Sequence, residues 1–131
     1  MSPATENPNP QRAEIDRFIL SEIDSVPHLE ALLLLWNSRP KQWPVEELAS
    51  FLYIPADRTR EILQDLQQRE LVVMTFSGCF YNPNYSGGNL MEEVDRTYRR
   101  ELVRVSNMIH SKASPAVREF ARAFRFKKDK P

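Results

Sequence analysis

Apolar residues recur at helical spacing through most of this chain, and only one stretch has the alternation and composition of paired strands. The strand formers lie at residues 71–76 and 79–82, on either side of a Ser77-Gly78 turn, which is typical of a β-hairpin. Helices are predicted at about residues 11–23, 27–37, 45–52, 56–69, 89–112 and 115–126. This order predicts a mainly α fold with a small β-hairpin.

The helical stretches differ in how they are expected to be buried. Residues 27–37 are apolar on nearly every side, which is typical of a helix at the centre of a core. Pro27, Pro44 and Pro115 suit the first turns of their helices. Residues 1–10 hold three prolines and no periodicity, so we expect a disordered leader. The predicted organisation is therefore a leader (1–10), a domain (11–88), a C-terminal helical extension (89–126) and a basic tail (127–131).

Composition excludes several classes of protein. The single cysteine, Cys79, allows no intrachain disulfide and no thiolate zinc site, and we expect it to be buried as a small hydrophobic residue. No membrane span or signal peptide is visible, so a cytoplasmic location is expected. His28 and His110 have no nearby carboxylate pair and are interpreted as structural or solvated. We therefore expect no enzyme activity, no metal and no cofactor.

The net charge of zero hides a gradient along the chain. Residues 1–24 and 25–76 carry net charges of −3 and −2, whereas residues 77–131 carry eleven bases against six acids. The surplus is densest after Ser111. Such an end can attract an anionic partner, or it can be a solvated helix face followed by a polar tail.

Two motifs connect this pattern to a known family. Residues 43–55, WPVEELASFLYIP, resemble a Trp-Thr-x-Glu-Glu-Leu-Ala-x-x-Leu-x-Ile-Ser pattern, and residues 62–72, ILQDLQQRELV, resemble (Ile/Leu)-Leu-x-x-Leu-x-x-x-Gly-Leu-(Val/Ile). Both patterns occur in winged helix-turn-helix domains, and the flanking helices are similar to those of MarR-like bacterial transcriptional regulators. The resemblance covers about residues 27–81.

The resemblance implies a transcriptional regulator that binds double-stranded DNA. The recognition helix at about residues 56–69 would enter the major groove, where Arg and Gln can read base edges. The base-contact candidates are Arg58, Thr59, Arg60, Gln64 and Gln67. The phosphate-contact candidates are the basic residues of the C-terminal end, Arg118, Arg122, Arg125, Lys127, Lys128 and Lys130.

The electrostatics favour an alternative, a winged helix that binds a protein. No Lys or Arg occurs from Glu70 to Asp95, although a wing of this family normally carries an Arg at its tip. Glu70 replaces the usual glycine after the recognition helix, and Pro55 stands where a capping Ser or Thr is usual. The partner-binding candidates are the aromatic residues Tyr81, Tyr85 and Phe126. Phe120 and Phe124 can serve the same purpose or belong to the core of the domain.

The predicted helix at residues 89–112 bears on the oligomeric state. It would be roughly 35 Å long, more than a core of this size requires. Its apolar stripe can pack back on the domain or pair with a second chain. Because two such helices flank a small module, we expect a homodimer.

Overall fold

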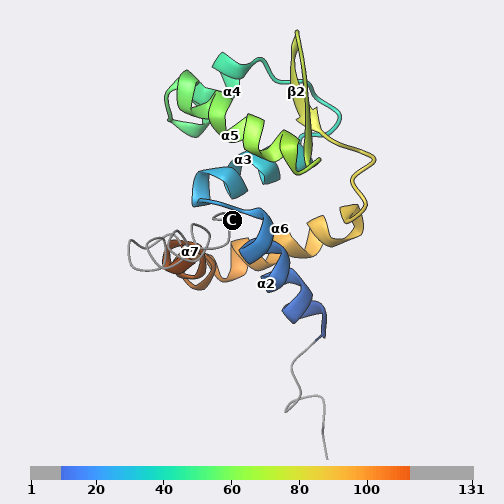
Figure 1. Ribbon diagram of the computed structural model, residues 1–131, viewed down its shortest axis with the longest axis vertical. Helices are drawn as coiled ribbons and strands as arrows, with labels where there is room; N and C mark the ends of the chain where they lie inside the picture. Colours follow the sequence, from blue (N-terminus) through green and yellow to red (C-terminus); the bar gives the residue numbers. More distant parts are fainter. Residues whose placement is uncertain (1–9, 113–131) are drawn as a thin grey trace, which may run out of the picture.

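The computed structural model describes residues 10–112, and Figure 1 shows how they are arranged. In this part the chain is mainly helical, with one two-stranded antiparallel sheet. In chain order the elements are α2 (Pro10–Glu22), α3 (Val26–Asn37), α4 (Val45–Leu52), α5 (Ala56–Gln68), β1 (Val72–Thr75), β2 (Gly78–Tyr81), the 3-10 helix η1 (Gly88–Leu90), α6 (Met91–Arg100) and α7 (Leu102–Lys112). The expected mainly α fold with a small hairpin is confirmed.

Helix α3 lies between two layers (Figure 1). We call α4, α5 and the β1–β2 hairpin the upper layer, and α2, α6 and α7 the lower layer. Ser25 caps the N-terminus of α3, where its Oγ accepts a hydrogen bond from the backbone N–H of His28, and Pro27 lies in the first turn. Leu29, Leu32 and Leu35 are fully buried, which confirms the central position predicted for this helix.

The two helices of the upper layer begin at prolines. Pro44 precedes α4 and Pro55 precedes α5, and neither helix receives a side-chain cap. Between them Tyr53 adopts a left-handed conformation with φ of 59°, which costs an ordinary L-residue about 1–2 kcal/mol. Glu70, after α5, also has a left-handed backbone, with φ of 64°. This is the position at which the winged-helix pattern that the sequence resembles has glycine.

The hairpin is paired from Val72 with Tyr81 to Thr75 with Gly78. A third segment joins its side, because Trp43 and Cys79 exchange two backbone hydrogen bonds of 2.9 Å. This approach requires a glycine next to Cys79, since a Cβ on Gly78 would lie 2.7 Å from the carbonyl oxygen of Trp43. Cys79 is buried, as expected, and burial raises the pKa of its thiol to about 11.

The single helix predicted at residues 89–112 is wrong, because the structure breaks it into α6 and α7 at Glu101. Glu101 has φ of −128° and ψ of 49°, outside the helical region. Its carboxylate accepts two hydrogen bonds from Arg12, of 2.8 and 3.0 Å, and one of 2.6 Å from Arg104. Arg104 also binds both carboxylate oxygens of Asp16, at 3.0 and 3.2 Å. The break therefore brings α7 against α2.

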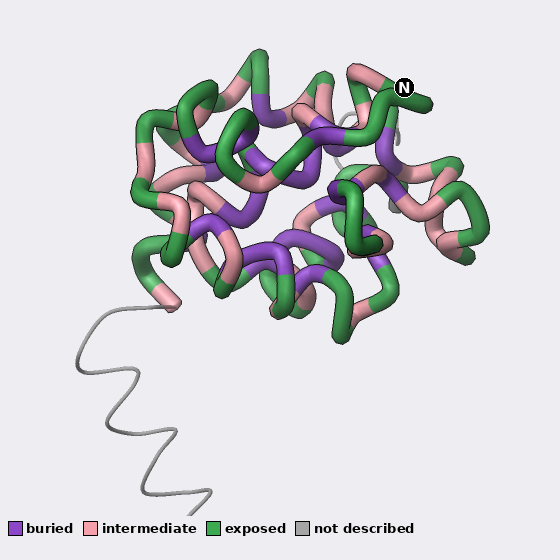
Figure 2. Tube along the Cα trace, turned by 90° about the horizontal axis from the view of Figure 1, so that it is seen from above, coloured by how far each residue is buried: buried purple, intermediate pink, exposed green. Residues whose placement is uncertain are grey.

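One hydrophobic core runs through both layers, and Figure 2 shows its buried segments inside a rim of exposed ones. Ile19 from α2, Leu66 from α5 and Ile109 from α7 are all fully buried in it. The amphipathic helix predicted from residue 11 to 23 is confirmed, and it starts one residue earlier, at Pro10. Among residues 10–112, no helix is long and apolar enough to cross a bilayer.

Candidate interaction surface

The exposed side of α5 is the surface that sequence analysis selects for binding, and its arginines are occupied. Arg58 pairs with Glu61 at 3.1 Å. Arg60 pairs with Asp57 at 3.3 Å and with Glu46 of α4 at 3.4 Å. From residue 45 to 81 the chain carries six acids and three arginines, so the upper layer has a net charge of −3.

The other base-contact candidates, Thr59, Gln64 and Gln67, differ in their burial and hydrogen bonds. Thr59 is a wrong prediction, because it is fully buried and its hydroxyl donates a 3.0 Å hydrogen bond to the carbonyl of Pro55. Gln67 is exposed, but its Oε1 accepts a 2.7 Å hydrogen bond from the backbone N–H of Met74 and so joins α5 to the hairpin. Gln64 is exposed on α5. Of the five candidates, the structure therefore places Arg58, Arg60 and Gln64 at the surface of α5, where both arginines are ion-paired.

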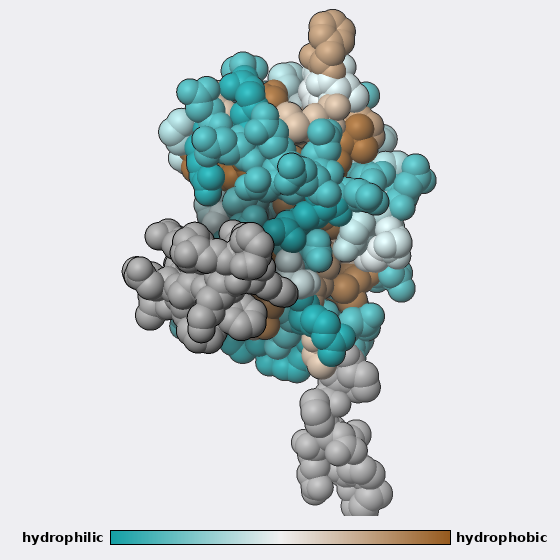
Figure 3. Space-filling view, viewed as in Figure 1, coloured by the Kyte–Doolittle hydropathy of each residue, from teal (hydrophilic) through white to brown (hydrophobic). Residues whose placement is uncertain are grey.

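The tip of the hairpin is apolar. Phe76 is fully exposed, and Figure 3 shows apolar surface at the tip, at the top of the molecule. Beside it, Ser77 donates a 3.2 Å hydrogen bond to Gln42, and Thr75 donates one of 3.1 Å to the carbonyl of Gly78. The tip thus presents an aromatic ring on a hydrogen-bonded turn.

Two of the partner-binding candidates lie inside the fold. Tyr81 is buried, which makes its assignment as a partner contact wrong; its hydroxyl has no hydrogen-bond partner among the described residues, and burial raises its pKa. Tyr85 is half-buried against Phe18, with ring centroids 6.3 Å apart, and burial also raises its pKa. Phe126 lies outside the described residues. So do the six phosphate-contact candidates, Arg118, Arg122, Arg125, Lys127, Lys128 and Lys130.

A groove of about 350 Å³ opens between α3, the C-terminal end of α4 and α6. Its lining is largely apolar, and two exposed aromatic residues, Phe51 and Tyr53, belong to it. Glu30 also lines the groove and accepts a 3.0 Å hydrogen bond from the hydroxyl of Tyr98. Burial, together with this hydrogen bond and the charge of Glu30, raises the pKa of Tyr98 to about 12. We call this site the α3–α6 groove.

The charges of the α3–α6 groove are negative on balance. Glu30 forms no ion pair within residues 10–112, whereas Asp95 is paired with Arg99 at 3.1 Å. The groove therefore combines an apolar floor with one carboxylate, Glu30, that forms no ion pair in the described part of the chain, while Arg99, which also lines it, pairs with Asp95. Such a surface fits an apolar group followed by a basic one.

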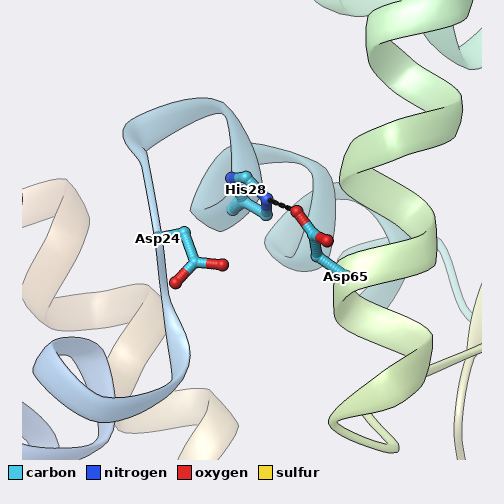
Figure 4. Close-up of side chains that lie close together, drawn as sticks. All are labelled: Asp24, His28 and Asp65. Carbon is cyan, nitrogen blue, oxygen red and sulfur yellow. Dashed lines mark hydrogen bonds and ion pairs between the residues drawn. The ribbon is translucent and has the colours of Figure 1, made fainter. Parts of the chain in front are cut away.

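Figure 4 shows a second polar cluster, formed by Asp24 from the α2–α3 connection, His28 from α3 and Asp65 from α5. His28 is buried; its Nε2 lies 2.8 Å from Asp65 Oδ2 and its Nδ1 lies 2.6 Å from Ser25 Oγ. The three ligand atoms lie within 4.8 Å of one another, a spacing that could hold a metal ion. Asp24, however, already pairs with Arg69 at 3.1 Å.

Both ring nitrogens of His28 are hydrogen-bonded, so the cluster as it stands works as a structural link between α3 and α5. A metal ion would have to displace Arg69 from Asp24 and Asp65 from the ring. We therefore interpret His28 as structural, one of the two alternatives favoured by the sequence. His110 is exposed on α7.

Comparison with known proteins adds no assignment: no family model, no curated protein and no solved structure matches this chain.

Sequence reasoning missed three exposed aromatic residues, Phe51, Tyr53 and Phe76. A signal was available for Phe51, because the apolar residues that recur at helical spacing in its helix are Val45, Leu48, Ala49 and Leu52, and Phe51 lies outside that stripe. The link between His28 and Asp65 had no local signal, since the two residues are 37 positions apart.

Proposed function

We propose that residues 27–81 form a winged helix-turn-helix that binds a protein partner, with α5 and the hairpin as the contact surface. The observation that carries this proposal is the ion pairing of Arg58 and Arg60 on a surface of net charge −3. DNA affinity depends largely on cations that neutralise phosphates. A DNA contact through this surface would first have to break those pairs and then overcome the remaining acids.

The exposed aromatic residue of the hairpin supports a protein partner. Phe76 has 105% of its reference surface exposed. Aromatic side chains are enriched at the centre of protein interfaces, where burying one contributes much of the binding energy. The surface thus offers an apolar anchor among acids, and it fits a partner with apolar and basic side chains.

Photo-crosslinking in cells of the source organism tests this proposal. A benzophenone amino acid replaces Phe76 in one full-length variant and Leu20, on the lower layer, in a second. Leu20 is the matched control because it is an apolar residue that is also exposed. We expect a discrete protein adduct from position 76 that is absent from position 20.

Two results would contradict the proposal. Adducts of equal yield and equal mass from positions 76 and 20 would show that the hairpin is not selective. A nucleic-acid adduct from position 76 would show that the hairpin lies on DNA or RNA.

A second candidate function is a DNA-binding transcriptional regulator, and the basic C-terminal end supports it. Residues 113–131 carry six bases and two acids, which can supply the phosphate contacts that the hairpin lacks. Under this proposal α5 reads bases through Arg58 and Gln64. The full-length variant with Arg118, Arg122 and Arg125 replaced by Gln should then bind random duplex DNA more weakly and with a shallower salt dependence. Unchanged affinity would contradict it.

We further propose that the protein is a cytoplasmic homodimer without enzyme activity. The apolar stripes of the flanking helices are buried in the core of the same chain, so support for the dimer comes from the apolar residues that α7 leaves exposed, Leu102 and Val103. Light scattering on the full chain tests it, and a monomer mass at micromolar concentration would contradict it.

A further inference from the structure

An occupant of the α3–α6 groove has to match both its apolar lining and the carboxylate of Glu30, which accepts a hydrogen bond from Tyr98 but forms no ion pair within residues 10–112. Phe51 has 59% of its surface exposed, although it packs edge-on against Trp43 at a centroid distance of 5.5 Å. Tyr53, beside it, combines a left-handed backbone with an exposed ring. A strained residue that also exposes an aromatic ring is kept at a cost in stability, and such residues cluster at binding sites.

The chain itself contains a segment with matching chemistry. Residues 113–131, which lie outside the described part, include Phe120, Phe124 and Phe126, and they carry a net charge of +4. The groove supplies the complement, because Glu30 has no cationic partner within residues 10–112. An aromatic, basic segment therefore fits the groove in both respects.

The segment is also long enough to reach the groove. Arg99 lines the groove, and Lys112 ends α7. Three Cα steps from Arg99 to Leu102 and the rise along α7 separate the two residues by at most about 27 Å. With residues 115–126 as the helix that the sequence predicts, three extended steps from Lys112 to Pro115 and the rise of the helix carry Phe124 about 24 Å and Phe126 about 27 Å from Lys112.

We propose that the α3–α6 groove binds residues 115–126 of the same chain, with phenylalanine rings against Phe51 and Tyr53 and an arginine beside Glu30. This docking site goes beyond the proposed function of the hairpin surface and does not depend on it. It also gives Phe120 and Phe124 a place in the core of their own chain, one of the two alternatives that the sequence leaves open.

Paramagnetic relaxation enhancement in the full-length protein tests the proposal. A nitroxide is attached to a cysteine introduced by Lys128→Cys; the native Cys79 is buried and its pKa of about 11 keeps it protonated, so it reacts slowly. We expect the amide signals of Leu34, Tyr53 and Asp95 to lose most of their intensity, while the signal of Ser77 at the hairpin tip keeps its intensity.

Two variants show whether the aromatic contacts cause the loss. Phe51→Ser combined with Tyr53→Ser should restore the groove signals, whereas Phe76→Ser, which removes an exposed ring outside the groove, should leave the loss unchanged. Because the three side chains are exposed, none of these substitutions removes a core residue.

The proposal is overturned if the groove signals keep their intensity, or if the strongest loss falls on another surface. It is also overturned if the loss persists when Phe120, Phe124 and Phe126 are all replaced by Ser. A loss seen only between a labelled chain and an isotope-enriched second chain would assign the groove to another copy and would overturn binding within one chain. None of these outcomes depends on whether the hairpin crosslinks to a protein.

Discussion

The lower and upper layers use their charged residues in different ways. In the lower layer, Arg12 and Arg104 bind carboxylates that lie 88 or 89 residues away along the chain, and they hold α2 and α7 together. In the upper layer, Arg58 and Arg60 bind acids no more than 14 residues away, on α5 and α4. Arg12 and Arg104 therefore fix tertiary structure, whereas Arg58 and Arg60 are neutralised locally, on a layer that also exposes aromatic rings. Arg69, at the C-terminal end of α5, is the long-range exception in the upper layer, since it pairs with Asp24 at 3.1 Å.

The difference supports the upper layer and its edge as the binding surface that we propose. Phe51, Tyr53 and Phe76 belong to α4, its C-terminal end and the hairpin, and all three lie in the upper layer or its edge. Burying them would stabilise the fold, so their exposure is a cost that binding can repay. The following predictions test this contrast, starting with the largest effect.

Gly78→Ala should lower the free energy of unfolding by about 2–3 kcal/mol, because the new Cβ meets the carbonyl of Trp43 and strains the backbone that holds the hairpin. Urea denaturation measures the change. Gly87→Ala is the control, since its Cβ would meet the ring of Tyr85, which can move. Equal losses from both substitutions would show that the hairpin does not depend on this close backbone approach.

Arg104→Ala should lower the free energy of unfolding by about 1 kcal/mol, since it removes bonds to Asp16 and Glu101 that join α7 to the rest of the fold. The matched control is Arg96→Ala, whose partners Glu92 and Glu93 both lie on its own helix. We expect no measurable change in the control. A loss in Arg96→Ala as large as that in Arg104→Ala would break the contrast between the two kinds of ion pair.

Tyr53→Gly should raise the free energy of unfolding by about 0.5–1 kcal/mol, because glycine adopts a positive φ without strain. Tyr53→Ala keeps the backbone strain and should not raise the free energy of unfolding. Comparing the two variants therefore separates the effect of the backbone strain from the effect of losing the ring. Thermal and urea denaturation give the sign. A loss of stability in Tyr53→Gly would mean that the exposed ring supports the fold rather than a binding site.

The smallest predicted effect is on the free energy of unfolding at acidic pH. Hydrogen bonds from Arg12 and then Arg104 lower the pKa of Glu101 from 4.5 to about 2. Because the folded pKa is depressed, this group stabilises the protein above pH 4.5, and the contribution is lost as the pH falls toward 2. Glu101→Gln should therefore be less stable than the wild type at pH 7, and the gap should narrow toward pH 2. A stability difference between the two proteins that stays constant from pH 7 to pH 2 would contradict the lowered pKa of Glu101.

Local features of the fold could be predicted from the sequence because their causes are local. Proline placement marks the starts of α3 and α4, and the Ser77-Gly78 turn marks the hairpin. The break at Glu101 could not be predicted, because residues 89–112 carry an uninterrupted helical pattern and the bonds that stabilise the break come partly from Arg12. Contacts between residues so far apart have no signal in a single sequence.

In the candidate site, too, long-range contacts that the sequence does not reveal decide which side chains are buried. Arg58 and Gln64 were correctly placed on an exposed helix face, but Thr59 and Tyr81 turned inward. Tyr81 is paired with Val72 on the hairpin, and the face of the hairpin that packs on α3 is decided by tertiary contacts. Residue type alone marks an aromatic residue as a candidate anchor and does not tell which side of the strand it occupies.

The central claim is that the surface of α5 does not bind nucleic acid by itself. Fluorescence anisotropy of a labelled random duplex, titrated with the full chain at about 50 mM salt, compares the wild type with the Arg58→Ala/Arg60→Ala double variant. The account predicts equal affinity for the two proteins. A loss of about tenfold or more in the variant would show that these arginines contact DNA, and it would contradict the account.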